Sequence, residues 1–189
     1  MDGGRITAVG SVPEEPGDQV VRVDGDIITA GLINTHHHFY QWMTRGWAFD
    51  CTGLGVDGVA SNEIGGLFPE LRMALFLARQ RDLSSTTFMP ADALRLATEG
   101  GARCLGRDDV GRLEPGYRAD VVVWPGDDLG DVLDPVAGLV LGPERYARHV
   151  FVEGEYVVRD GSLLGADMNS LRQDLARRAH RLWPEEAAR

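Results

Sequence analysis

Three consecutive histidines, His36, His37 and His38, follow an apolar run at residues 27–33, in a chain that has only two further histidines. Because side chains alternate along an extended segment, His36 and His38 share one face while His37 points away. Neutral imidazole nitrogens are good ligands for zinc and iron. The spacing therefore predicts half of a metal site, with a surface histidine cluster as the alternative.

The residues around the triplet form a recognisable motif. Residues 28–46, ITAGLINTHHHFYQWMTRG, resemble the first barrel strand of the amidohydrolase superfamily, in the cyclic deaminase branch that includes 8-oxoguanine deaminases and hydroxytriazine hydrolases. The resemblance implies that His36 and His38 are metal ligands. It also makes Gln41 a candidate to reach a substrate carbonyl, although a polar surface residue is an equal alternative at that position.

Two later stretches carry the same resemblance. Residues 53–63, GLGVDGVASNE, resemble the end of the family's last barrel strand and imply that Asp57 binds the metal and acts as the proton-shuttling base. An ordinary turn at Asp57 is the alternative. Residues 91–106 and 111–124 resemble the family's tail, in which a helix leads out of the barrel into a small β-sandwich.

The chemistry that the resemblance implies is hydrolytic deamination of a heterocyclic amine, such as an aminopurine or an aminotriazine. One divalent metal, zinc or alternatively iron, lowers the pKa of a bound water toward neutrality. The aspartate takes the proton of that water and relays it to the leaving nitrogen. The expected partner is thus a small heterocyclic amine, with His36, His38 and Asp57 as ligands and Asp57 as the base.

Length limits how much of the barrel the chain can hold. Barrel-like sequence occupies residues 31–106, whereas a (β/α)₈ barrel needs about 250 residues. The expected fold class is α/β, a remnant of the barrel (its first and last strands plus helices) attached to a small composite β-sandwich. The expected units are the N-terminal part of the sandwich (1–30), the barrel remnant (31–106), the C-terminal part of the sandwich (107–165) and a C-terminal helix (166–189).

The shortened barrel bears on the site in two ways. First and last strands are neighbours in a closed barrel, so we expect His36, His38 and Asp57 together at the C-terminal ends of adjacent strands. The family's further histidines and glutamate belong to strands that are missing here. His149 is expected to be a partly exposed structural histidine, and His180 to lie on a helix without a catalytic role.

Three hypotheses for function remain open from the sequence. The first is a metal-dependent amidohydrolase that works in an assembled form. The second is a catalytically inactive, internally deleted remnant. The third is a small metal-binding or interaction module that uses the histidine triplet without chemistry. Bound metal with turnover would favour the first hypothesis, and bound metal without turnover the third. Neither metal nor turnover would favour the second.

Local patterns predict the remaining elements. Alternating or apolar runs bounded by Gly and Pro indicate strands, and 3.6-residue periodicity indicates helices. A helix at 69–80 is expected to bury Met73 and Phe76, and a helix at 92–99 to be capped by Gly100 and Gly101. The expected strands are 5–9, 19–24 and 119–124, with a hairpin at 148–159 that turns at Glu153 and Gly154 and an amphipathic helix at 168–183.

Composition narrows the setting of the protein. The formal net charge of −10 argues against a nucleic-acid partner, which requires clustered cations. Cys51 and Cys104 form no CxxC motif, which favours a reducing cytoplasm, and neither a signal peptide nor a membrane span is expected. An opened barrel leaves apolar faces uncovered, so we expect a homo-oligomer.

Overall fold

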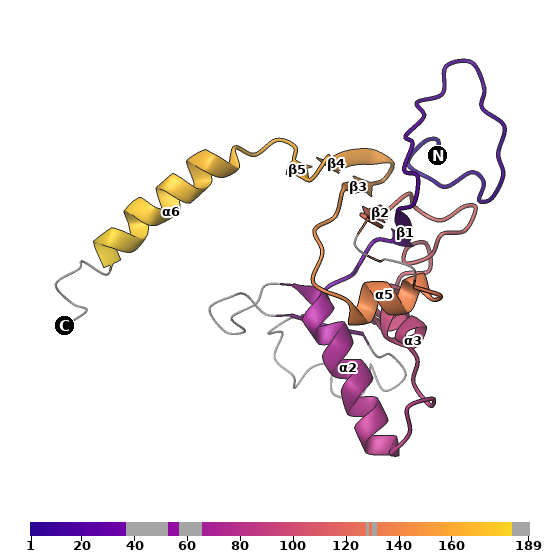
Figure 1. Ribbon diagram of the computed structural model, residues 1–189. Helices are drawn as coiled ribbons and strands as arrows, with labels where there is room; N and C mark the ends of the chain where they lie inside the picture. The colour runs from indigo at the N-terminus through magenta and orange to yellow at the C-terminus, as the bar shows by residue number, and fades with distance from the viewer. Residues whose placement is uncertain (37–52, 57–65, 128, 130–131, 183–189) are drawn as a thin grey trace.

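The computed structural model describes residues 1–36, 53–56, 66–127, 129 and 132–182, and it shows an antiparallel sheet beside a group of helices (Figure 1). The sheet has five strands in the order β1-β2-β3-β4-β5. These are β1 (Ile27–Ala30), β2 (Val121–Trp124), β3 (His149–Val152), β4 (Glu155–Arg159) and β5 (Ser162–Leu163). The helices are α2 (Leu67–Asp82), α3 (Pro90–Arg95), the π-helical turn η1 (Leu96–Gly100), α4 (Gly101–Cys104), α5 (Pro135–Leu141) and α6 (Met168–Leu182).

The sheet joins distant parts of the chain. β1 pairs antiparallel with β2, with Ile27 opposite Trp124 and Ala30 opposite Val121. The N-terminal and C-terminal parts therefore share one sheet, as the expected composite unit requires. A second sheet is absent from the described residues, so the β-sandwich and the four-unit division stay predictions.

β2 lies at the centre of the packing. All four of its residues are buried, which is typical of a strand covered on both faces. On the helical side, Trp124 meets Phe68 edge-on at 5.0 Å between ring centroids, and its Nε1–H donates to Thr29 Oγ1 at 3.0 Å inside the core. The largest fully buried side chains on this side are Leu71, Leu75, Leu139 and Val140.

Two predicted elements are confirmed by their local chemistry. The β3–β4 hairpin turns at Glu153 and Gly154, whose φ angles of 52° and 82° give the twist that a two-residue hairpin prefers. Helix α2 contains the predicted helix and ends at Leu83, with φ 48°. The Ser84 N–H bonds to the Arg79 carbonyl at 3.1 Å, as in a left-handed helix end.

The predicted burial of Met73 and Phe76 is wrong. Both are about half exposed, at 56% and 51%. Helix α2 packs on α3 and α5 through a stripe that includes Phe68, Leu71 and Leu75. Met73 and Phe76 lie off that stripe and face away from the core, because the helix repeats every 3.6 residues.

The strands predicted at 5–9 and 19–24 are also wrong. Only Arg5 of these residues makes a ladder contact, as isolated bridges to Asp2 and to Arg118. A strand needs a continuous partner, and the described residues offer none along 7–24. Pro13 and Pro16, which lack a backbone N–H, lie between the two segments.

The helix predicted at 92–99 is longer than expected. It begins at Pro90 and continues through η1 and α4 to Cys104. Gly100 and Gly101 have helical φ angles of −61° and −60°, so they do not cap it. Gly106, with φ 66°, takes the left-handed conformation instead.

Helix α6 projects from the rest of the molecule, on the side of the sheet away from the N-terminal loop (Figure 1). None of its side chains is buried. In the part of the chain that the structure describes, no helix is long and apolar enough to cross a bilayer.

Candidate functional site

Residues 31–36, which lead from β1 to the first histidine of the triplet, are fixed by backbone hydrogen bonds. Alternate residues donate their N–H groups, each to a different part of the fold. The three bonds are Gly31 to the Asp120 carbonyl (2.8 Å), Ile33 to the Ala97 carbonyl (2.7 Å) and Thr35 to the Leu54 carbonyl (2.9 Å). Residues 31–36 are thus anchored to the sheet, to a helix and to residues 53–56.

The π-helical turn provides the helix anchor. In an α-helix the Ala97 carbonyl would accept from the Gly101 N–H. Here that N–H bonds to the Leu96 and Thr98 carbonyls instead, which leaves the Ala97 carbonyl to Ile33. A Cβ on Gly101 would lie 2.6 Å from the Ile33 Cβ. Gly101 therefore allows close packing of the segment on the helix, which explains why it does not serve as a cap.

Asn34 joins residues 31–36 to residues 53–56. Its Oδ1 accepts from the His36 N–H and from the Val56 N–H, both at 3.0 Å. Its Nδ2 donates to the Val56 carbonyl at 2.9 Å. The Thr35 hydroxyl adds a bond to the Leu54 carbonyl at 2.8 Å. We call Asn34 and its three hydrogen bonds the Asn34 clamp.

Glycines permit this close approach. A Cβ on Gly55 would lie 2.7 Å from the His36 nitrogen, a distance that no side chain tolerates without movement of the backbone. A Cβ on Gly53 would lie 3.0 Å from Thr35 Oγ1 and 3.1 Å from Cys104 Sγ. Residues 53–56 can lie against residues 34–36 because two of their four positions lack side chains.

Of the predicted site residues, only His36 lies within the described residues. It is exposed at the end of its segment, with its backbone held by the Asn34 clamp. His38, Gln41 and Asp57 lie outside the described residues, so their roles stay predictions. The segments that lead to His38 and to Asp57 are in direct contact, but residues 31–36 and 53–56 form no strand, so the pairing of first and last barrel strands stays a prediction.

A complete metal centre is not contained in the described part of the chain. Among residues 1–36, 53–56, 66–127, 129 and 132–182, no group of three His, Cys, Asp or Glu side chains is arranged to hold a metal. A three-ligand centre at His36 would need ligands from outside these ranges, which is where His38 and Asp57 stand in the sequence.

His149 is structural, as expected, but its predicted partial exposure is wrong. It is buried, at 6% exposure, because β3 lies between β2 and β4. Its Nδ1 accepts from the Asp160 N–H at 3.3 Å, and the Tyr156 ring lies edge-on at 5.6 Å. His180 is exposed on α6.

Sequence reasoning missed Asn34 and the π-helical turn. A signal for Asn34 was present, because it is a polar residue that ends an apolar run two positions before His36. The adjacent Gly100 and Gly101 gave a signal for close packing as well as for a cap. The acceptors of these bonds, Val56 and Ala97, are distant in sequence and could not be found from local pattern.

Comparison with known proteins agrees with the resemblance. Residues 48–158 match the model of the amidohydrolase family. An 8-oxoguanine deaminase from Pseudomonas aeruginosa is 41% identical over 121 residues, which are 63% of this chain and 27% of that enzyme. The matched region is therefore less than a third of the length of this relative.

Solved structures give the same result. The crystal structure of atrazine chlorohydrolase from Arthrobacter aurescens, complexed with zinc, matches with a TM-score of 0.60 and 34% identity, over 66% of this chain and 29% of that one. An adenosine deaminase from Xanthomonas campestris with bound zinc matches with a TM-score of 0.63 and 28% identity, over 68% and 30%. The family model spans more than half of the residues, and the chain belongs to the amidohydrolase family.

Proposed function

We propose that this protein is a metal-dependent hydrolase of carbon–nitrogen bonds that deaminates a heterocyclic amine, such as an aminopurine or an aminotriazine. The proposal rests on the hydrogen-bonded contact between residues 31–36 and 53–56. It brings together the two segments whose sequences lead into the family's histidine ligands and its aspartate. The names of the relatives, deaminases and a chlorohydrolase, support the same class of substrate.

Residues in this contact, and those that follow each segment in the sequence, include a ligand set that suits a divalent metal, zinc first and iron second. His36 and His38 would supply two imidazoles and Asp57 a carboxylate, a three-ligand set of the kind that catalytic zinc sites use. The Asn34 clamp fixes the backbone at His36, and His36 is accessible to an ion from solvent. When bound, the metal would lower the pKa of a water molecule toward neutrality.

The role of the chain's own residues would be proton transfer and orientation. Asp57 would take a proton from the water and pass it to the leaving nitrogen, a general acid–base task. Gln41 would contact a polar atom of the ring. Asn34 would keep the segment of His36 at a fixed distance from the segment of Asp57, because it bonds to the backbone of both His36 and Val56.

Ammonia release, measured together with metal content, tests the proposal. The zinc-loaded chain is expected to release ammonia from an aminopurine or an aminotriazine, and His36→Ala and Asp57→Ala to abolish release. His180→Ala is the matched control, since that histidine is exposed on α6, and it should leave release unchanged. Bound metal without turnover would contradict the proposal in favour of a binding module, and neither metal nor turnover would favour an inactive remnant.

A further inference from the structure

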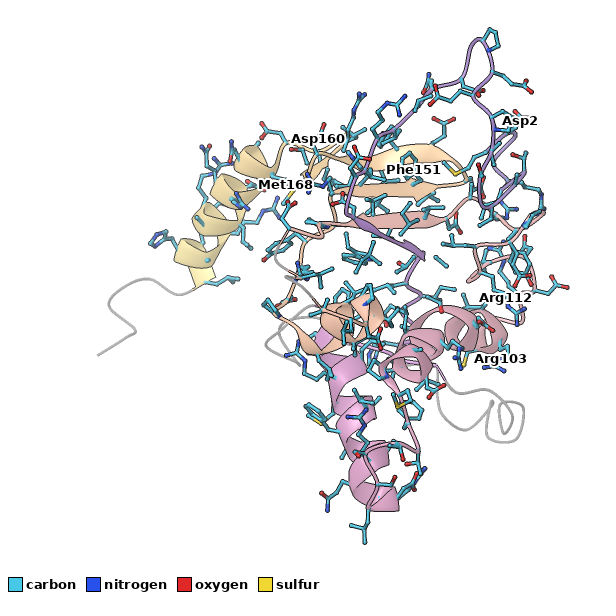
Figure 2. All side chains as sticks on the ribbon, turned by 45° about the vertical axis from the view of Figure 1, so that its right-hand side comes forward. Asp2, Arg103, Arg112, Phe151, Asp160 and Met168 are labelled. Carbon is cyan, nitrogen blue, oxygen red and sulfur yellow. The ribbon has the colours of Figure 1, made fainter. Side chains whose placement is uncertain are left out.

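Helix α6 presents an apolar stripe that no other described part of the chain covers. Its side chains are unburied along its whole length, and Figure 2 shows it apart from the sheet, beginning at Met168. The stripe consists of Met168, Leu171, Leu175 and Leu182, which are 42%, 54%, 68% and 70% exposed. Spacings of three, four and seven residues place them on one face. An isolated helix of this length is marginal in water, so the stripe calls for a partner.

Charge indicates what kind of partner fits. Helix α6 carries four arginines and one aspartate, a formal charge of +3, whereas the whole chain has −10, so the remaining residues sum to −13. Asp174 forms ion pairs with Arg177 at 2.7 Å and Arg178 at 2.9 Å. Arg172 lies next to Leu171 along the edge of the stripe. The matching surface should combine apolar side chains with an excess of carboxylates.

The N-terminal loop at residues 7–24, here called the valine loop, has these properties. Within it, four carboxylates and one arginine give a formal charge of −3, opposite and equal to that of α6. Among the described residues, the loop forms one ion pair, between Arg22 and Glu14 at 3.0 Å. The exposed apolar side chains are Val9 (60%), Val12 (56%), Val20 (48%) and Val21 (38%).

The two surfaces face away from each other within one chain. The valine loop and α6 lie on opposite sides of the sheet in both views (Figures 1 and 2). We propose that α6 docks on the valine loop of a second copy of this chain, and that the reciprocal contact closes a two-fold dimer. Each copy then gives one helix and receives one, as a two-fold interface requires. An anionic lipid surface is the less favourable partner, since the chain as a whole is acidic and is repelled by it.

Sedimentation of the full chain over a range of concentrations tests this dimer. A dimer is expected at low salt and should weaken at high salt, because exposed charges are screened. Leu171→Gln with Leu175→Gln is expected to weaken association by about tenfold or more, from the loss of buried apolar area. The matched control is Gln173→Ala with His180→Ala, on the polar face of α6, which should not change it. Since α6 buries no side chain within its own chain, each variant should unfold at the same temperature as the parent at concentrations where both are monomeric.

Exchanging one charge on α6 with one on the valine loop tests whether these two surfaces meet in the dimer. Arg172→Glu and Glu15→Arg should each weaken the dimer, and the two together should restore it. A chain that is monomeric at every concentration would overturn the proposal, as would a double variant that shows only the sum of both losses. Flotation with vesicles of phosphatidylcholine and phosphatidylglycerol, lost in Arg172→Glu, would assign α6 to a lipid surface instead.

Discussion

The packed core and the candidate site are held together by different forces. Under the sheet, Leu71, Leu75 and Leu139 are almost completely buried, and apolar burial supplies the stability. At the site, His36 is exposed, and its segment is held by backbone bonds and by the Asn34 clamp. Stability and site geometry therefore depend largely on different residues, so mutations can test the two separately.

The two regions meet at one helix. Ala97 is a member of the core cluster, and its carbonyl anchors Ile33 of the site segment. Gly101 contacts Ile33 from the next turn of the same helix. Changes at this junction should affect both stability and the site strongly, whereas changes elsewhere should affect mainly one of them.

The largest expected effect is on the core alone. Leu71→Ala should lower the free energy of unfolding by about 2–5 kcal/mol, through lost burial and the cavity that remains. Urea denaturation measures it. Leu77→Ala, on the exposed side of the same helix at 60% exposure, should change stability by less than about 0.5 kcal/mol. Equal losses in the two variants would show that α2 does not pack as described.

At the junction, Gly101→Val should cost about 1–3 kcal/mol, because the new side chain overlaps Ile33. Gly101→Ala should cost less, and Ile33→Ala should recover part of the loss when combined with Gly101→Val. Denaturation of the double variant measures this coupling. Strict additivity would mean that the two residues do not touch.

Within the site, Asn34→Ala removes the clamp. Stability should fall by only about 1 kcal/mol, since these bonds are partly exposed to water. Zinc affinity, measured by competition with a chelator, should fall by about 10- to 100-fold, as for other residues that orient metal ligands. Thr35→Val, which removes the hydroxyl bond to the Leu54 carbonyl and leaves the Asn34 clamp in place, should reduce the affinity less. An unchanged affinity in Asn34→Ala would separate the clamp from the metal site.

The smallest effect is expected at a partly exposed cluster of charged residues outside both regions. Hydrogen bonds from Arg107 and then from Arg118 lower the pKa of Asp109. A carboxyl group with a lowered pKa in the folded state stabilises the fold above its unfolded pKa of about 4 and loses this contribution as the pH falls further. Asp109→Asn should therefore flatten the loss of stability between about pH 5 and pH 2. If the parent chain and Asp109→Asn lost stability in parallel over this pH range, the prediction would be contradicted.

The elements that depend on residues close together in the sequence could be predicted from the sequence. The turn at Glu153 and Gly154, the apolar run of β2 and the start of α2 near Pro69 all follow from residues within a few positions of each other. The histidine motif likewise indicated the family, because its residues are contiguous.

The remaining features of the fold and of the candidate site depend on contacts between residues that are distant in the sequence. Local patterns do not reveal such contacts. Residues 5–9 and 19–24 have the composition of strands but find no continuous neighbour among the described residues. Gly101 was read as a cap, although its role is close contact with Ile33, which is distant in sequence. Asn34 was missed because its bonds to Val56 close a loop whose ends meet only in the fold.

The central claim is that His36 belongs to a metal site built where residues 31–36 meet residues 53–56. Equilibrium titration of the metal-free chain with zinc, at neutral pH, tests it most directly. We expect a single tight ion per chain, lost in His36→Ala and retained in His180→Ala. Equal binding by His36→Ala and the parent chain would contradict the account.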